Sequence, residues 1–182
     1  QFRNEKALIA QRAAELIKDG DSLMIDSGTT TLELAKCLCT KKDLNLVTID
    51  IRIATYMEMH SDATIFLPGG ILRKGFNCTT GSMTISALYG LNVDKVFMAT
   101  NALSLKKGFT TPNMEHAECK KAMIAIARQC IMLMDSSKMG RVNFLKFADL
   151  SDIDQMVIDS GVSQKALDAI RDHNPDLEVY VV

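Results

Sequence analysis

The sequence of 182 residues lacks several features that mark broad classes of protein. No apolar run approaches the roughly 18 residues of a membrane-spanning helix, so we expect a chain that does not cross a bilayer. Neither sign of charge is in excess, because 21 Lys and Arg stand against 22 Asp and Glu. Most domains that bind a DNA or RNA backbone carry a basic face, so this chain alone is a poor candidate for such binding. An apolar fraction of 47% excludes wholesale disorder and is enough for the core of one domain.

Regular cysteine spacing is also missing. The five cysteines are odd in number and irregularly placed, and none lies near a histidine in a zinc-binding pattern. We therefore expect reduced, partly buried thiols in a cytoplasmic protein, with no metal and no cofactor. The sequence starts at Gln1 without an initiator methionine or an apolar targeting segment, so we expect that further sequence precedes it.

Helical and strand patterns alternate along the chain. Helices are predicted over residues 4–19, 30–39, 51–60, 82–89, 114–128 and 163–172, and strands over 22–26, 46–48, 64–67, 95–100, 130–135, 154–158 and 178–182. Thr30 and Glu33 have the spacing of a capping box for the second helix, and the turn-rich residues 104–113 indicate a loop over a site. This order predicts an α/β fold, a doubly wound and mostly parallel sheet of about six or seven strands formed by a single domain over residues 1–182.

The first predicted strand is followed by Asp26, Ser27, Gly28, Thr29 and Thr30, at the edge where ligands collect in open α/β sheets. Hydroxyl groups, close backbone approach at the glycine and free N–H groups at a helix start suit a phosphate monoester. An ordinary helix start after a strand would carry the same residues, so both interpretations stay open here. The segment has neither the order of a Walker loop nor that of G-x-G-x-x-G, so nucleotide binding is not indicated.

Later strand ends offer weaker signals. Gly69 and Gly70 suit either a close approach of ligand or backbone, or a tight turn. Arg73 could hold a phosphate or carboxylate through two parallel hydrogen bonds, and Lys138 could supply a cation, although both residue types are more often solvated. The three histidines have no catalytic spacing, so none is assigned a catalytic role.

A series of short motifs covers nearly the whole chain in order. Taken together, these motifs resemble the C-terminal effector-sensing domain of DeoR-type bacterial transcription repressors. They are Asn4-x-Lys6-x-x-Ile9-Ala10-x-x-Ala13-Ala14, Gly20-Asp21-Ser22, Asp26-Ser27-Gly28-Thr29-Thr30, Val47-Thr48, Leu67-Pro68-Gly69-Gly70, Gly81, Gly108-Phe109-Thr110, Lys121-x-Met123-Ile124, Asp135-Ser136-Ser137-Lys138-x-Gly140 and Phe147-Ala148-x-Leu150-x-Asp152-Ile153-Asp154.

The resemblance implies a fold similar to that of pentose-phosphate isomerases and CoA-transferases. It implies a regulator of sugar metabolism whose effector is a phosphorylated sugar or related metabolite. It also implies a homo-oligomer that contacts DNA only through a winged helix-turn-helix domain upstream of these 182 residues. The predicted helix 4–19 would join that domain directly, so it is our candidate for the segment that transmits ligand binding.

Comparison with the isomerase implies which residues hold the effector. The residues expected to bind its phosphate are Lys6, Ser27, Gly28, Thr29, Thr30 and Lys138. The residues expected around its sugar are Asp26, Asp50, Gly69, Gly70, Arg73, Asn101, Glu115 and Lys121.

The same comparison indicates that the catalytic groups of the isomerase are missing. Its two aspartates after the fourth strand are matched by Met98 and Asn101, its following lysine by Thr111, and its general-base glutamate by Lys120. A cationic lysine cannot abstract a proton from a sugar carbon, so we expect a sensor rather than an enzyme and predict no catalytic residue.

Two alternatives stay open at this point. A slip of register would let Glu115 or Glu118 reach the site, which would make the chain a sugar-phosphate isomerase. A protein of the acyl-CoA-transferase type is a weaker alternative, because no catalytic glutamate is well placed for it. Residues 97–102 also lack the glycines that DeoR sequences usually have after the fourth strand, which puts side chains near the sugar.

Overall fold

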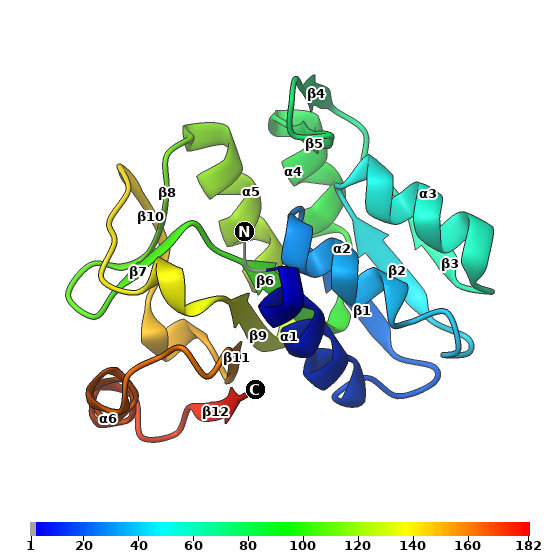
Figure 1. The fold of residues 1–182 in the computed structure, drawn as a ribbon. Helices are drawn as coiled ribbons and strands as arrows, with labels where there is room; N and C mark the ends of the chain where they lie inside the picture. The colour runs from blue at the N-terminus through cyan, green and yellow to red at the C-terminus, as the bar shows by residue number, and fades with distance from the viewer. Residues whose placement is uncertain (1–2) are drawn as a thin grey trace.

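A parallel sheet of seven strands runs through the computed structural model, which describes residues 3–182 (Figure 1). The strand order is β12-β11-β9-β6-β1-β2-β3, and all six neighbouring pairs are parallel. The strands are β1 (Ser22–Ile25), β2 (Asn45–Thr48), β3 (Thr64–Phe66), β6 (Val93–Ala99), β9 (Ala127–Met134), β11 (Gln155–Ile158) and β12 (Glu178–Val181). The predicted fold class is confirmed, and each of the seven predicted strands is present.

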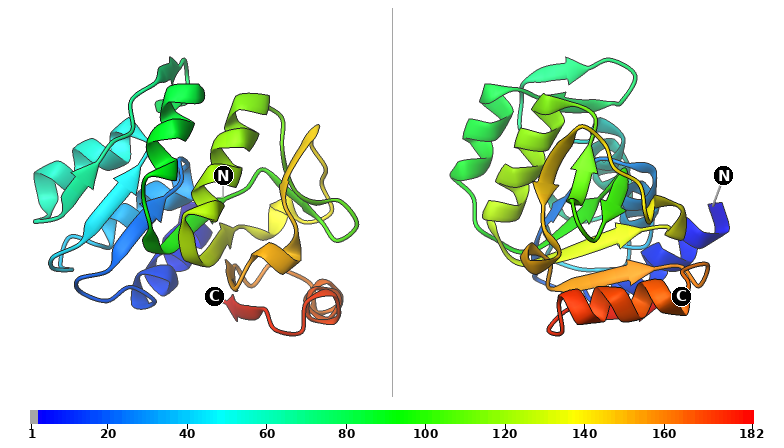
Figure 2. Two further views of the ribbon diagram at one scale, coloured as in Figure 1. Left: turned by 180° about the vertical axis from the view of Figure 1, so that it is seen from behind. Right: turned by 90° about the vertical axis from the view of Figure 1, so that its left-hand side faces the viewer.

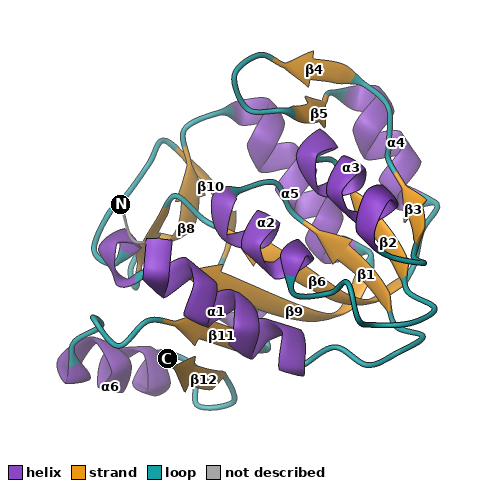
Figure 3. Ribbon diagram, turned by 45° about the vertical axis from the view of Figure 1, so that its right-hand side comes forward, coloured by secondary structure: helices purple, strands orange, loops and turns teal. Residues whose placement is uncertain are grey.

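Helices cover both faces of this sheet, because neighbouring residues of each central strand point to opposite faces and are apolar on both. Leu23 and Ile25 of β1 belong to one buried cluster, whereas Met24 belongs to the other. The first cluster packs under α1 (Arg3–Glu15), α2 (Thr29–Lys36) and α3 (Ile51–His60), which lie together on one face (Figure 3). The second packs under α4 (Ser82–Tyr89), α5 (Met114–Ala125) and α6 (Gln164–His173).

Two small antiparallel sheets were not predicted. One contains β7 (Ala102–Ser104), β8 (Gly108–Thr111) and β10 (Leu145–Ala148), in the order β10-β8-β7 (Figure 2). The other is the hairpin of β4 (Ile71–Arg73) and β5 (Cys78–Thr80). Residues 104–113 are expected to be a loop, but Ser104 belongs to β7 and residues 108–111 form β8. These two strands make a β-hairpin, and β8 also pairs with β10. Gly108 makes this packing possible, since its φ is +75° and an added Cβ would lie 2.4 Å from the Ala148 carbonyl oxygen.

Several helix ends differ from the prediction. The first helix ends at Glu15 and not at residue 19, and α5 ends at Ala125 because the backbone from Ala127 onward pairs in β9. The predicted capping box of the second helix is wrong: α2 begins at Thr29, and its N-cap is Gly28, which has no side chain to cap it. None of the helices in the described residues is both long and apolar enough to cross a membrane. No disulfide joins the five cysteines, all of which lie in the described residues: Cys78, Cys119 and Cys130 are buried, and Cys37 and Cys39 are half-buried.

Candidate functional site

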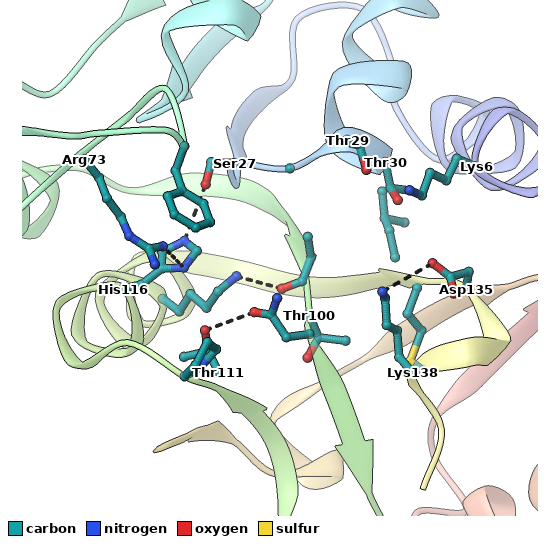
Figure 4. A pocket seen from close by; sticks show the side chains of 18 of the residues that line it. Lys6, Ser27, Thr29, Thr30, Arg73, Thr100, Thr111, His116, Asp135 and Lys138 are labelled. Atoms are coloured by element: carbon teal, nitrogen blue, oxygen red, sulfur yellow. Dashed lines mark hydrogen bonds and ion pairs between the residues drawn. The ribbon is translucent and has the colours of Figure 1, made fainter. Parts of the chain in front are cut away.

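A cavity of about 310 Å³ opens where β1, β6 and β9 end (Figure 4). In doubly wound sheets this edge is where ligands bind, and the volume lies at the small end of the range for ligand cavities. Its wall also receives side chains from α1, α3, α5 and the β4–β5 hairpin. The lining residues are Lys6, Ser27, Gly28, Thr29, Thr30, Arg52, Arg73, Gly75, Phe76, Ala99, Thr100, Asn101, Thr111, Pro112, His116, Lys120, Leu133, Met134, Asp135 and Lys138.

One side of the cavity, which we call the helix end, is formed by Thr29 and Thr30 at the start of α2 together with Lys6 and Lys138 (Figure 4). The first N–H groups of a helix have no partner within the helix, and the N-cap Gly28 offers no side-chain acceptor. Lys6 reaches the site because α1 packs against α2. Two ammonium groups beside a helix N-terminus form a site that favours an anion.

Close packing favours glycine at position 28, in the turn into α2. An added Cβ would lie 3.3 Å from both the Ala99 Cβ and the Thr31 Oγ1, which is a tight contact on two sides. The backbone at Gly28 is extended, with φ 161° and ψ 171°, so space and not backbone strain is the reason for glycine. The small residue lets the start of α2 lie directly over the end of β6.

The opposite side, which we call the arginine end, is formed by Arg73 and Phe76 of the β4–β5 hairpin and by His116 of α5. The Arg73 guanidinium lies over the Phe76 ring, with its Cζ 3.6 Å from the ring centroid. Arg73 Nη1 donates to His116 Nδ1 at 3.4 Å. Because arginine can only donate, the proton of a neutral His116 is on Nε2, which lies 3.4 Å from Ser27 Oγ.

His116 is neutral at pH 7. Burial, and secondly the nearby Lys120 ammonium, lower its pKa from 6.5 to about 4. No role is predicted for His116 from the sequence, because a lone histidine without a nucleophile at a catalytic spacing carries no signal. The sequence signal that could have placed His116 is Asn113, an N-cap residue. Its side chain accepts from the His116 backbone N–H at 2.9 Å, which puts the histidine in the first turn of α5.

A buried ion pair forms the cavity floor: Lys120 lines the cavity, and Asp26 lies beneath it, outside the lining residues. The Lys120 side chain is 1% exposed and the Asp26 side chain is fully buried. The aspartate also accepts from the backbone N–H of Ser27 at 2.8 Å and of Ala99 at 3.0 Å, and Lys120 Nζ donates to the Ala99 carbonyl at 2.7 Å. The position that the isomerase comparison assigns to a general base is therefore occupied by a lysine that is already ion-paired.

Neutral polar groups line the middle of the cavity. Thr111 Oγ1 donates to Asn101 Oδ1 at 3.0 Å, and Thr100 lies between the helix end and the arginine end (Figure 4). This arrangement leaves the Asn101 amide N–H groups as donors for a ligand. The comparison with the isomerase placed Asn101 and Thr111 at catalytic positions, and neither carries a carboxylate or a cation.

Cations dominate the cavity wall. Lys6, Arg52, Arg73, Lys120 and Lys138 line it, and Asp135 is the one acidic residue among the lining residues. Three of these cations are ion-paired: Arg52 with Asp50 at 2.7 Å, Lys120 with Asp26, and Lys138 with Asp135 at 3.9 Å. Lys6 and Arg73 form no ion pair with a carboxylate of the described residues. The electrostatics therefore favour an anionic ligand.

The structure brings eight of the fourteen predicted site residues together in the cavity wall. They are the six predicted phosphate-binding residues, Lys6, Ser27, Gly28, Thr29, Thr30 and Lys138, and two of the predicted sugar-binding residues, Arg73 and Asn101.

The other six predicted residues lie outside the cavity wall, where five have a bonding partner and Gly70 packs closely against Thr84. Two of them are buried carboxylates: Asp26 pairs with Lys120, and Asp50 caps α3 and pairs with Arg52.

The remaining four lie in the hairpin region and on α5. The Gly69 carbonyl accepts from Thr84, and an added Cβ on Gly70 would lie 2.1 Å from Thr84 Oγ1. Glu115 accepts from Thr80 Oγ1 at 3.2 Å, and Lys121 pairs with Glu118 at 2.8 Å on the surface.

Within residues 3–182, no group of three His, Cys, Asp or Glu side chains is arranged to hold a metal ion. The single acidic residue of the cavity wall gives a metal one carboxylate ligand at most. The site as built therefore offers hydrogen-bond donors and positive charge.

Comparisons with known proteins place these observations in a family. Residues 1–160 match the family model described as the DeoR C-terminal sensor domain. The chain is 35% identical to an uncharacterized HTH-type transcriptional regulator of Haemophilus influenzae, over 95% of this chain and 67% of that protein. It is 35% identical to the HTH-type transcriptional regulator GlpR of Haloferax volcanii, over 85% of this chain and 60% of that protein. The chain thus spans between 60% and 67% of the length of these relatives.

The fold is shared with an enzyme. Ribose 5-phosphate isomerase A from Methanocaldococcus jannaschii superposes with a TM-score of 0.56 and 14% sequence identity, over 76% of this chain and 55% of that one. At this identity the likeness shows the fold alone, and it agrees with the fold expected from the sequence motifs.

Proposed function

Because this chain belongs to the DeoR family of transcriptional regulators, as its C-terminal sensor domain, we propose that its cavity binds a phosphorylated sugar or a related phosphorylated metabolite as effector. The domain is a sensor and not an enzyme. One observation carries the proposal: the N-terminus of α2, which has no side-chain cap, opens into the same cavity as Lys6 and Lys138. A phosphate dianion satisfies the free N–H groups, the helix dipole and the two ammonium groups together.

The rest of the ligand would occupy the middle of the cavity. Asn101 and Thr111 offer amide and hydroxyl groups of the kind that bind sugar hydroxyls. Ser27, whose hydroxyl lies 3.4 Å from His116 Nε2, offers a further hydroxyl near the arginine end (Figure 4). The phosphate would supply most of the affinity, and the contacts in the middle would select the sugar.

Regulation requires that the effector bind two states of the protein with different affinity. We propose α1 as the transmitting element, because it carries Lys6 and packs against α2, β9 and β11. A phosphate held by Lys6 would bias the position of α1. The complete regulator would be a cytoplasmic homo-oligomeric repressor of sugar metabolism that binds DNA through a winged helix-turn-helix domain preceding Gln1.

The isomerase alternative is supported by the shared fold alone and not by the residues of the cavity wall. The one carboxylate of the wall, Asp135, faces Lys138 at 3.9 Å and accepts from Ser137, and the glutamates on α5 lie outside the wall. Within the described residues, the wall therefore offers no unpaired carboxylate to move a proton between adjacent sugar carbons.

Thermal unfolding with a panel of sugar phosphates tests the proposal. A ligand at 100 times its Kd adds about 2.7 kcal/mol, which for a domain of this size raises Tm by about 5–10 °C. Thr30→Val removes the hydroxyl of a buried residue at the helix end and should reduce that shift strongly. Thr64→Val, on the exposed edge strand β3, is the matched control and should keep it.

Two results would contradict the proposal. One is an equal shift from the same sugar without its phosphate, and the other is a full shift in Thr30→Val. Turnover of pentose phosphates by the same sample would favour the enzyme instead.

A further inference from the structure

The cavity has positive charge at two separate places. The helix end carries Lys6 and Lys138, and the arginine end carries Arg73 on the far side of Thr100 (Figure 4). A sugar monophosphate needs only the first of these. The second therefore calls for its own explanation, since an unpaired cation facing a cavity is a recognition feature for an anion.

Among the described residues, Arg73 is held in place without an anionic partner. Its guanidinium lies 3.6 Å above the Phe76 ring centroid, and one of its N–H groups donates to His116 at 3.4 Å. Arg52, in contrast, donates to both carboxylate oxygens of the buried Asp50, at 3.1 and 2.7 Å. The stacking and the histidine fix the plane of the Arg73 fork before any ligand arrives, which lowers the entropic cost of binding.

The charge at each end matches a different anion. At the arginine end, His116 is neutral because burial lowers its pKa to about 4, and Asp50 neutralises Arg52. The remaining positive charge is the planar guanidinium of Arg73. It suits a carboxylate, which has a single charge and two coplanar oxygens. The helix end has an unpaired Lys6, a Lys138 that lies 3.9 Å from Asp135, and the dipole of α2, which together suit a phosphate dianion.

We propose that the effector is a phosphorylated sugar acid, whose carboxylate binds Arg73 while its phosphate lies at the start of α2. This inference rests on the proposed function, because it takes phosphate binding at the helix end as given. The hydroxyl groups between the carboxylate and the phosphate would meet Asn101 and Thr111 in the middle of this cavity of about 310 Å³.

Isothermal titration calorimetry on the 182-residue chain at pH 7.5 tests the inference with matched ligands. The two main probes are 4-phosphoerythronate and erythritol 4-phosphate, which differ only in a carboxylate against a hydroxymethyl group. A charge-assisted pair with Arg73 should make the acid bind at least about tenfold more tightly. Erythritol 1,4-bisphosphate, which carries a second phosphate in place of the carboxylate, should bind more weakly than the acid.

Variants of Arg73 test whether this residue causes the preference for the acid over the polyol phosphate. In Arg73→Gln the ratio of the two dissociation constants should fall to near one, and in Arg73→Lys it should take an intermediate value because the charge remains without the fork. Lys74→Gln is the matched control: it removes an exposed cation from the next position of the same hairpin, outside the cavity wall, and should keep the full ratio.

Three results would overturn the inference while leaving the proposed function intact. They are equal binding of acid and polyol phosphate by the unmodified chain, tighter binding of the bisphosphate than of the acid, and an unchanged ratio in Arg73→Gln. Failure of every phosphorylated probe to bind would instead overturn the proposed function together with the inference.

Discussion

Replacing Lys120 by methionine should destabilise the domain by breaking its buried ion pair. Methionine has a similar length, so the change removes the ammonium group without leaving a large void. What remains is the Asp26 carboxylate, which is fully buried and has lost its counter-charge. An uncompensated buried charge is among the most costly defects in a folded protein.

The structure sets the size of this effect. Removal of one partner of a buried pair typically costs about 3–5 kcal/mol. Asp26 keeps two backbone donors, the N–H groups of Ser27 at 2.8 Å and Ala99 at 3.0 Å, which still stabilise its charge. We therefore expect a loss near the low end, about 3 kcal/mol, which corresponds to a fall in Tm of about 6–12 °C for a domain of this size.

Urea unfolding followed by circular dichroism at pH 7 measures this loss. Lys121→Met is the matched control, because Lys121 is the next residue of α5 and pairs with Glu118 on the surface, where the side chains are 51% and 47% exposed. Its substitution should change the free energy of unfolding by less than about 0.5 kcal/mol. If Lys120→Met costs no more than Lys121→Met, Lys120 is not the counter-charge of Asp26 and the account of the cavity floor is wrong.

Adding Asp26→Asn to the same chain tests whether the two residues act as a pair. Once the carboxylate is gone, loss of the ammonium group should cost much less, so the two substitutions should not be additive. The double variant should still be less stable than the unmodified chain. An asparagine amide can accept from one of the two backbone N–H groups but presents its own N–H groups to the other. Additive losses would contradict the pairing.

Two further predictions concern His116 and Gly70. The pKa of His116 is lowered from 6.5 to about 4, so the unfolded chain binds more protons between these values and the domain loses stability as pH falls through them, by about 3 kcal/mol in total. His116→Gln should flatten this part of a plot of unfolding free energy against pH, and an unchanged slope would show that the histidine is not the cause. Gly70→Ala should destabilise by about 1–3 kcal/mol in urea unfolding, because the new Cβ would lie 2.6 Å from the Thr80 carbonyl oxygen, whereas Gly69→Ala meets nothing within 4 Å and should be nearly neutral.

The central sheet could be predicted from the sequence because its strands are apolar on both faces. Segments such as residues 130–135 and 154–158 give short apolar runs that separate clearly from the helices between them. The polar residues that follow these runs then had to meet at one edge, since all seven strands are parallel. This placement brought Ser27, Asn101 and Lys138 to one cavity without any knowledge of distances.

The small antiparallel strands could not be predicted, although they are about as long as most central strands. They contain more polar residues and glycine, and no helix separates β4 from β5 or β7 from β8. The β4–β5 hairpin, which brings Arg73 and Phe76 to the cavity, was therefore not predicted either. Sequence reasoning also could not separate Asp26 from Ser27, its neighbour. One carboxylate lies under the floor and one hydroxyl lines the wall, and that difference depends on Lys120, which is 94 positions away in sequence.

A crystal structure with the bound sugar phosphate that gives the largest thermal shift tests the central claim most directly. We predict the phosphate within hydrogen-bond distance of the first backbone N–H groups of α2, with the Lys6 and Lys138 ammonium groups beside it. A phosphate bound elsewhere on the domain, or a cavity that stays empty at saturating ligand, would contradict the account.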